Sequence, residues 1–335
     1  MDEPNAMPSQ HEIADWMSRC GLATKPSEVT EIVSIGDGNM NLVFRVTAGG
    51  RYIIVKRSVP YVAKYPQIAA PVQRIATEIA FYESVADHPD LAGSMPTLLG
   101  ADAEGHTMLL EAIDHRGDWR KLYDPSHRES VEPIFGKAVS WLRRLHGIAA
   151  PPEIGCDPLR ELNHSHWFEL PLSQPPVIDL DAISPGLDRA TETVRGDERL
   201  RRAIARIGRQ YLHPASAAPR CLLHGDYFPG AWLDIGSDAV CVIDPEFAFV
   251  GPPEFDLGVL IAHHRFCGGD PVTVPRWLSA YSPSMPLDSV RIQTIAATET
   301  IRRLLGVAQL PLVADTEQRL HWIDEASALL LRFAD

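Results

Sequence analysis

Residues 242–258 of the chain read VIDPEFAFVGPPEFDLG. Together with the residues just before it, this stretch has an alternating pattern that predicts a short strand over 240–243. Pro245 breaks the strand, because proline cannot donate a hydrogen bond to a neighbouring strand. Asp244 and Glu246 therefore lie in the turn that follows. An aspartate at a strand end can also serve only its own turn, by accepting from local backbone N–H groups, and that alternative stays open for this turn taken alone.

A second turn of the same kind lies upstream, in the stretch LLHGDYFPGAWL at residues 222–233. There His224, Gly225 and Asp226 follow two leucines. Two carboxylate-bearing turns, each behind an apolar strand, are what a magnesium-dependent phosphoryl-transfer site needs. One aspartate orients or deprotonates the attacking hydroxyl, and the other holds the metal against the phosphates. The pair of turns therefore predicts a kinase-type site.

A glycine-bearing hairpin near the N-terminus supplies a third signal. Residues 36–41 read GDGNMN between two predicted strands, and Lys56 ends the next strand, YIIVK. Glycines let the backbone approach a polyphosphate closely, and a lysine at the end of a strand can bring a positive charge to it. An ordinary turn and an edge lysine are the alternatives. The order hairpin, lysine, glutamate-bearing helix (72–85), HGD and DPE favours the functional interpretation.

The chain divides into two parts by pattern. Strands are predicted on both sides of the hairpin, at the lysine strand and near 96–101 and 107–113, with helices over 9–20 and 72–85. From about residue 117 the pattern becomes helical. Helices are predicted over 131–145, 188–212, 255–265, 275–281, 288–307 and 315–333. Residues 151–186 are rich in Pro, His and Trp and are expected to be irregular. We therefore expect an α+β fold.

Composition sets further limits. The chain has 335 residues, a net charge of −13 and five scattered cysteines without a C-x-x-C pair. This charge argues against nonspecific binding to nucleic acid or to an anionic membrane. The cysteines indicate neither a disulfide scaffold nor a zinc site. No signal peptide and no apolar run of membrane-spanning length is visible, so a cytoplasmic protein is expected.

Several segments together resemble a known superfamily. The order of the motifs is similar to that of the protein-kinase-like phosphotransferases acting on small molecules, which include aminoglycoside phosphotransferases and choline kinases. Within that superfamily four segments resemble methylthioribose kinase; they read IGDGNMNLVF (35–44), KRSVPY (56–61), VIDPEFAFVGPPEFDLG (242–258) and ETIRRLLGVA (299–308). The resemblance implies a bilobal protein-kinase-like fold. Its parts would be an N-terminal nucleotide-binding lobe (1–110) with a small, mostly antiparallel sheet, a hinge (111–116), and a larger, mainly helical catalytic and acceptor-binding lobe (117–335).

The resemblance also implies roles for single residues, with ATP and Mg²⁺ as cofactors. Asp226 would contact the acceptor hydroxyl as the catalytic aspartate, and Arg302 and Arg303 would help to bind a sugar. Asp244 and Glu246 would hold magnesium. The nucleotide would be bound by the hairpin, the lysine with its helix-borne partner, and the hinge, namely by Gly36, Asp37, Gly38, Asn39, Asn41, Lys56, Glu78, Glu111 and Ile113.

The chain departs from the family near the catalytic turn. Aminoglycoside phosphotransferases carry asparagine five residues after the catalytic aspartate, and methylthioribose kinases typically carry serine, but here the residue is Ala231. Magnesium needs only one or two carboxylates besides water and phosphate oxygens, so Asp244 and Glu246 can suffice. Tyr227, Phe228 and Trp232 replace smaller or polar family residues; core packing is their ordinary role, and a reshaped acceptor pocket is the alternative.

Three functions are compatible with these observations. The first is an ATP-dependent phosphotransferase acting on a hydroxyl of a sugar-containing small molecule, such as an antibiotic in a resistance reaction or a nucleoside. The second is methylthioribose kinase proper, although the stretch KYPQIAAPVQ (64–73) lacks the tryptophan-bearing substrate loop of that family. The third is an inactive pseudokinase that binds nucleotide. Because methylthioribose kinases are dimeric, the resemblance also leaves a homodimer open.

Overall fold

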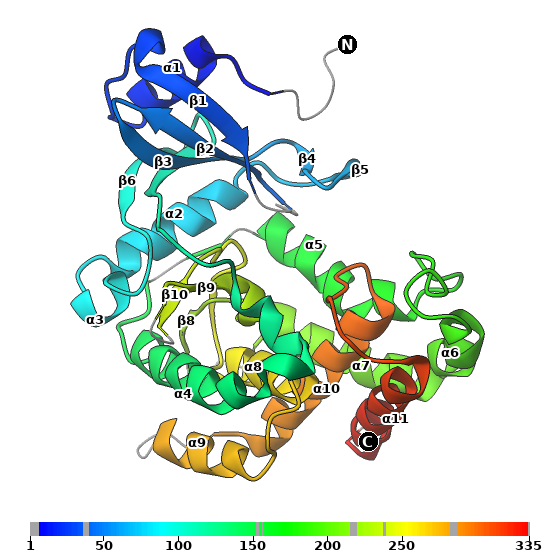
Figure 1. The fold of residues 1–335 in the computed structure, drawn as a ribbon. Coiled ribbons are helices and arrows are strands. Elements are labelled where there is room, and N and C mark those ends of the chain that lie inside the picture. The colour runs from blue at the N-terminus through cyan, green and yellow to red at the C-terminus, as the bar shows by residue number, and fades with distance from the viewer. Residues whose placement is uncertain are drawn as a thin grey trace.

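The fold has a sheet-containing N-terminal part and a helical C-terminal part (Figure 1). It was obtained as a computed structural model, which describes residues 7–35, 40–151, 154–155, 157–214, 220–236, 239–281 and 287–333. The predicted α+β class with an antiparallel N-terminal sheet is confirmed. Within these residues no helix has both the length and the apolar composition needed to cross a membrane.

The N-terminal part is built on a five-stranded sheet with strand order β1-β2-β3-β7-β6, in which all neighbours are antiparallel. Its strands are β1 (Val29–Ser34), β2 (Leu42–Ala48), β3 (Arg51–Arg57), β6 (Leu98–Asp102) and β7 (Thr107–Glu111). A small hairpin of β4 (Tyr61–Val62) and β5 (Tyr65–Ala69) follows β3. Helices α2 (Arg74–Val85) and α3 (Pro89–Ala92) lie between this hairpin and β6.

The two faces of the sheet bury different helices because side chains alternate along a strand. Helix α1 (Gln10–Arg19) packs Ile13 and Met17 against one face, which includes Val55 and Leu109. The opposite face, with Met108 and Leu110, packs against α2. Lys56 follows Val55 and therefore points to the α2 face. This alternation decides which helix can supply the partner of the lysine.

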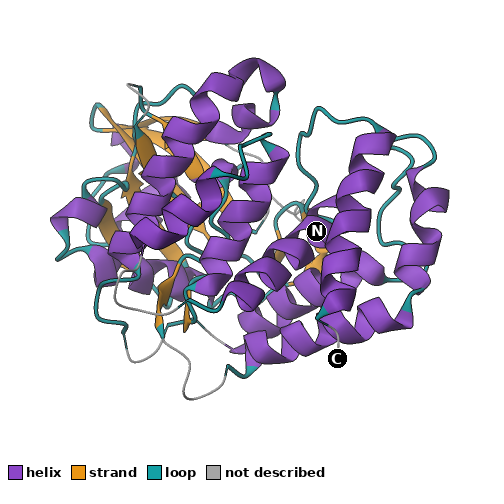
Figure 2. Ribbon diagram, turned by 90° about the horizontal axis from the view of Figure 1, so that it is seen from below, coloured by secondary structure: helices purple, strands orange, loops and turns teal. Residues whose placement is uncertain are grey.

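The C-terminal part consists mostly of helices, as Figure 2 shows. Its helices are α4 (Arg128–Leu145), α5 (Asp157–Phe168), α6 (Leu187–Gly196), α7 (Glu198–Leu212), α8 (Glu254–Phe266), α9 (Thr273–Tyr281), α10 (Ser289–Leu305) and α11 (Thr316–Arg332). Two short antiparallel ladders pair β8 (Cys221–Leu223) with β11 (Phe249–Gly251) and β9 (Trp232–Asp234) with β10 (Val240–Val242). These ladders carry the two carboxylate-bearing turns.

Two predictions of secondary structure were wrong in part. The segment expected to be irregular contains α5, because packing buries Leu159, Trp167 and Phe168 despite its weak periodicity. The single helix expected over 188–212 is divided into α6 and α7 at Asp197. The Asp197 carboxylate accepts hydrogen bonds from the backbone N–H groups of the residues that begin α7, and this N-cap starts a new helix.

The connection between the two parts leaves the sheet at Glu111, the last residue of β7. Beyond it, the N–H of Arg116 donates to the Asp234 carbonyl (2.8 Å), and the N–H of Asp234 donates to the Gly117 carbonyl (2.9 Å). These bonds attach the segment to β9 of the C-terminal part. The boundaries at 110 and 117 stay a prediction.

Candidate active site

Lys56 lies between two carboxylates. Its Nζ donates to Glu78 Oε1 at 2.5 Å and makes a shorter contact with Asp244 Oδ1. Glu78 is fully buried on α2, whereas the Asp244 side chain is 45% exposed. Burial disfavours the charged amine, but Asp244 and Glu78 outweigh it and hold the pKa of Lys56 well above its usual value. The lysine is therefore a fixed positive charge that joins the sheet, α2 and the turn after β10.

The turn that carries Asp244 and Glu246 is held against the N-terminal sheet. Asn41 Nδ2 donates to Glu246 Oε2 at 2.9 Å, while Asn41 Oδ1 accepts from Ser58 Oγ and from Arg74 Nε, both at 2.8 Å. Arg74 is completely buried and also donates to the carbonyls of Met40, Val59, Pro71 and Tyr61. Asn41 thus connects the start of β2 with the DPE turn.

Asp226 faces two guanidinium groups from α10. Its Oδ1 accepts from Arg303 Nη2 at 2.8 Å and from Arg302 Nη1 at 3.1 Å. Burial favours the neutral acid, but Arg303 and Arg302 outweigh it and hold the pKa of Asp226 below its usual value. The side chain keeps 17% exposure. It is therefore an ionised, accessible carboxylate with Oδ2 left for another partner.

The HGD turn is fixed by a buried aspartate of α8. Asp256, fully buried, accepts from the N–H of His224 (2.8 Å) and from that of Gly225 (3.0 Å). Gly225 has φ of 86°, and a Cβ there would lie 2.1 Å from the Phe247 carbonyl oxygen, so no other residue fits. The fold thus presents Asp226 on a rigid turn beside the DPE segment.

His224 joins the two carboxylate-bearing turns directly. Its Nε2 lies 3.0 Å from the Ile243 carbonyl, which can only accept, so Nε2 carries the proton. Nδ1 is then free to accept from the N–H of Asp226 (3.4 Å). Burial lowers the pKa of His224 and keeps the ring neutral, as this arrangement requires.

Glu299 holds the two arginines in place. Its carboxylate accepts from Arg303 Nε (2.6 Å), Arg302 Nη1 (2.8 Å) and His263 Nε2 (2.9 Å). Burial lowers the pKa of His263 to about 4, so its ring is neutral and its Nδ1 accepts from the Tyr123 hydroxyl at 2.6 Å. Aromatic rings support both guanidinium groups: the Arg302 Cζ lies 4.5 Å from the Trp167 ring centroid and the Arg303 Cζ 4.3 Å from that of Phe228.

The residues at the DPE turn fit a magnesium ion. Carboxylate oxygens are the donors that magnesium prefers, and it binds through one or two of them, with water and phosphate oxygens completing the shell. Burial and then the Asp244 charge raise the pKa of Glu246 to about 8, which marks a site short of positive charge. Across the described residues, no three His, Cys, Asp or Glu side chains are grouped as metal ligands. The ion would therefore need ligands from its substrate.

The aromatic residues around Ala231 belong to the core. Ala231, Tyr227 and Trp232 are buried, and Tyr227 stacks on Trp141 with ring centroids 5.3 Å apart. The reshaping of the acceptor pocket that these replacements suggested therefore does not come from Tyr227 or Trp232. Phe228 alone among the three lies under a site residue, where its ring supports Arg303.

Other predicted nucleotide residues are placed less completely. Gly36, Asp37, Gly38 and Asn39 lie outside the described residues. Glu111 is exposed, and its carboxylate accepts from Thr97 Oγ1 at 2.7 Å, whereas Ile113 is half-buried. Their role in binding adenine through the backbone stays a prediction.

Sequence reasoning assigned no role to Glu299 or Asp256. The spacing of Glu299 to Arg302 and Arg303, three and four residues on, is the spacing at which helix side chains meet, and it could have identified this cluster. A carboxylate inside the apolar run of α8 could have identified Asp256, because a buried charge requires partners. No comparable local signal in the sequence identifies the role of Arg74 in holding Asn41.

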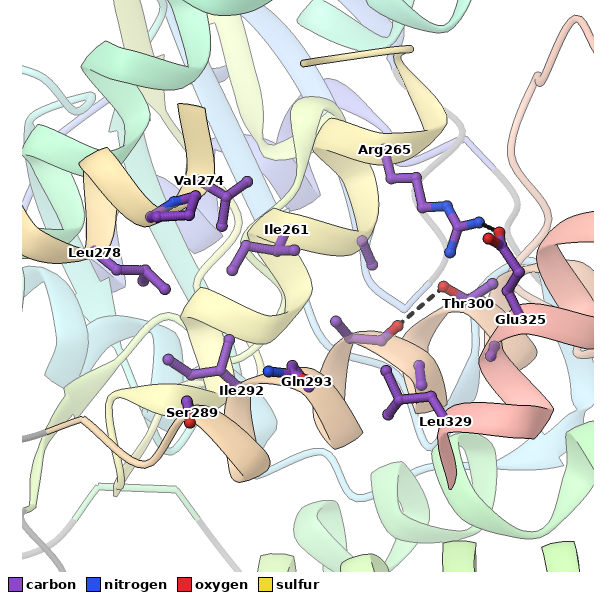
Figure 3. Close-up of a pocket in the computed structure, with 15 residues that line it drawn as sticks. Ile261, Arg265, Val274, Leu278, Ser289, Ile292, Gln293, Thr300, Glu325 and Leu329 are labelled. Carbon is purple, nitrogen blue, oxygen red and sulfur yellow. Dashed lines mark hydrogen bonds and ion pairs between the residues drawn. The ribbon is translucent and has the colours of Figure 1, made fainter. Parts of the chain in front are cut away.

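One cavity lies apart from these residues. Its volume is about 300 Å³, and it is lined mainly by apolar side chains of α8, α9, α10 and α11. Figure 3 shows the ion pair of Arg265 and Glu325 at one side of it. Of the described residues predicted from the sequence for catalysis, nucleotide, substrate or metal binding, none lines this cavity.

The raised pKa of Glu246 leads to a prediction about stability. A carboxyl group whose pKa is higher in the folded than in the unfolded state contributes stability that is fully present at a pH below its ordinary pKa of 4.5. That contribution is lost as the pH rises toward the folded-state pKa of about 8. The Tm of Glu246→Gln minus the Tm of wild type should therefore increase as the pH rises from 5 to 8 in metal-free buffer. Thermal unfolding at several pH values measures this. The same change at the exposed Glu83 of α2 is the control, and an equal gain there would contradict the prediction.

Comparison with known proteins shows what this chain is similar to. The sequence model of the phosphotransferase enzyme family matches residues 31–289, which is more than half of the chain. Curated relatives include methylthioribose kinases of Exiguobacterium sibiricum and Pectobacterium atrosepticum. The first is 28% identical over 255 residues and covers 69% of this chain and 60% of its own length. The second is 25% identical over 286 residues and covers 80% of this chain and 68% of its own length.

Solved structures support the fold alone. Choline kinase LicA from Streptococcus pneumoniae matches with a TM-score of 0.55 at 15% identity, covering 96% of this chain and 99% of that one. A second structure, of LicA in complex with AMP, matches equally well, at 16% identity and over 98% of its own chain. The resemblance inferred from the motifs is thus confirmed. The chain spans only about 60% to 68% of the length of the two methylthioribose kinases.

Proposed function

This chain belongs to the phosphotransferase enzyme family, and on that premise we propose that it transfers the γ-phosphate of ATP to a hydroxyl of a small sugar. One observation carries the proposal. Asp226 stands on a fixed turn with Arg302 and Arg303 bound to one oxygen of its carboxylate, and the DPE turn lies beside it. A carboxylate for the acceptor and a carboxylate pair for the nucleotide thus occur in one cluster.

On the acceptor side, Asp226 orients the attacking hydroxyl. Its second oxygen, Oδ2, accepts the hydroxyl proton in a hydrogen bond and aims the oxygen at the phosphorus. Because the two arginines lower the pKa of Asp226, it is a weak base. Its contribution is then mainly alignment, and it takes the proton late, after the bond to the leaving oxygen has largely broken.

On the nucleotide side, Lys56 provides positive charge to the phosphates and Glu78 keeps it in position. Asn41 holds Glu246, and with it the DPE turn, next to the start of β2. Asp244 and Glu246 would hold magnesium, which neutralises charge on the phosphates when bound. These residues bind and orient ATP, so that catalysis rests on positioning and charge.

Methylthioribose is the first candidate for the acceptor. The two curated relatives described above are named methylthioribose kinases, and this chain has the arginine pair that the resemblance assigns to sugar binding. An antibiotic acceptor has less support, since neither of these two curated relatives is named for an antibiotic. The pseudokinase alternative requires that the site does no chemistry, although Lys56, Asp226, Asp244 and Glu246 are all present in the chain.

An ADP-release assay with ATP and Mg²⁺ tests the proposal. The acceptors would be methylthioribose, ribose, a nucleoside, an aminoglycoside and choline, with chelated metal as the blank. We expect turnover with methylthioribose or ribose, none with the aminoglycoside or choline, and none after chelation. Turnover with the aminoglycoside alone would favour the antibiotic function. ATP binding without ADP release for any acceptor would favour the pseudokinase.

A further inference from the structure

A histidine beside the arginine pair has no role in the proposed function so far. His166 lies near the end of α5, and this helix packs against α10. The next residue in the chain is Trp167, whose ring supports Arg302. Its Nε2 is buried and has no hydrogen-bond partner within the described residues. Buried polar nitrogens are normally paired, because an unpaired one costs free energy. An unpaired nitrogen at a binding site therefore points to a missing partner.

The surroundings of His166 are those of the acceptor side. Burial first, and then Arg302 and Arg303, lower the pKa of His166 to about 3, and Asp226 and Glu299 act on it in the opposite direction. Its ring is therefore neutral at every physiological pH. A neutral imidazole nitrogen either donates or accepts, and a hydroxyl does both, so the two groups match without a charge.

A second unpaired group lies in the same cluster. The Nε of Arg302 is buried and has no partner in the part of the chain that the structure describes, although Nη1 of the same guanidinium binds both Asp226 and Glu299. Arg302 is only 1% exposed. Among the described residues there are thus two unpaired nitrogens here, one on the guanidinium that binds Asp226 and one on the helix that packs against α10. Arg302 Nη1 and Arg303 Nη2 both bind Oδ1 of Asp226, so the two unpaired nitrogens and Asp226 Oδ2 are the groups left for a ligand.

We infer that His166 is a specificity-determining residue of the acceptor site. Its Nε2 makes a hydrogen bond with a hydroxyl group of the sugar other than the hydroxyl that Asp226 orients. This inference rests on the proposed function and deepens it. The acceptor must then carry at least two hydroxyl groups, one for phosphoryl transfer and one for recognition, as a ribose-type sugar does and choline does not.

Kinetics of His166 variants test this role. His166→Ala should raise the KM for the sugar by about 3- to 10-fold, the effect of one lost uncharged hydrogen bond, with kcat within about twofold of wild type and the KM for ATP unchanged. His166→Gln, whose amide reaches the place of Nε2, should recover most of the loss. His164→Gln is the control on the same helix, since that side chain packs against Gly208 of α7 instead.

Sugars that lack one hydroxyl identify the contact. For the hydroxyl that binds His166, removing it from the sugar and making the change His166→Ala should have non-additive effects on the sugar KM, because both changes delete the same hydrogen bond. For any other hydroxyl the effects should add. A sugar KM of His166→Ala equal to that of wild type would overturn the inference, as would a fall in kcat with an equal rise of both KM values.

Calorimetry with the sugar alone separates this inference from the proposed function. If wild type binds the sugar but transfers no phosphate, and His166→Ala weakens binding, the proposed reaction is wrong and the role of His166 stands. If wild type phosphorylates the sugar and His166→Ala binds it equally well, only the role of His166 is wrong. If wild type neither binds nor phosphorylates any sugar tested, both are contradicted.

Discussion

Asp226→Asn should lower kcat by about 10²- to 10⁴-fold, the range expected for loss of a side chain that aligns a hydroxyl and accepts its proton. The asparagine keeps the shape of the side chain but no longer attracts the hydroxyl proton as an anion does. The affinity for ATP should stay near that of wild type, because Lys56, Glu78 and Asp244 are unchanged. The rate of ADP release and the shift in Tm on adding ATP and Mg²⁺ measure the two quantities.

The control for this variant is Asp90→Asn, at an exposed position of α3. It changes the net charge by the same amount far from the HGD turn, and its kcat should equal that of wild type. An Asp226→Asn protein with a kcat within about fivefold of wild type would contradict the proposed role, since general acid–base and orienting groups contribute more than that.

Glu299→Ala should give the largest loss of stability among the changes discussed. Removing one partner from a buried ionic cluster typically costs about 3–5 kcal/mol, because the opposite charges stay buried without compensation. Of the counter-ions in the described residues, Arg302 and Arg303 would then keep Asp226 alone. Urea unfolding measures the free energy. The activity of the remaining folded protein should fall as well, since the arginines lose the carboxylate that orients them.

The difference in unfolding free energy between wild type and Glu299→Ala depends on pH with a defined sign. Arg302, Arg303 and the bond from His263 outweigh burial and lower the pKa of Glu299 in the folded state. Its contribution is therefore complete above its ordinary value of 4.5 and is lost as the pH falls below that value toward the lower folded one. The stability difference between wild type and Glu299→Ala should thus narrow in acid.

Glu192→Ala, at an exposed position of α6, is the control for helix propensity and charge. Its free energy of unfolding should lie within about 0.5 kcal/mol of wild type. A loss for Glu299→Ala no larger than that would mean that the arginines find other partners, and the account of the cluster would be wrong.

The order of the chemical groups along the chain could be derived from the sequence. Strand-ending turns are local features, and a glycine or a proline fixes them with few residues, so Asp226 and Asp244 were found from short stretches. The strands of the N-terminal sheet and most helices were predicted from periodicity, which is also a local feature of the sequence. Helix α5 was missed because its stability comes from the burial of Trp167 and Phe168 against distant residues, which no local pattern contains.

The sequence by itself determined which residues are proposed to carry the chemistry, because residue type and local turn geometry are encoded within a few positions. Only the tertiary structure decided how those residues are held. The Asp226 carboxylate meets arginines 76 and 77 positions away, and Asn41 meets Glu246 across 205 positions. Such contacts depend on how helices and strands pack around one core. The partners of a buried charge are therefore visible only once the chain is folded.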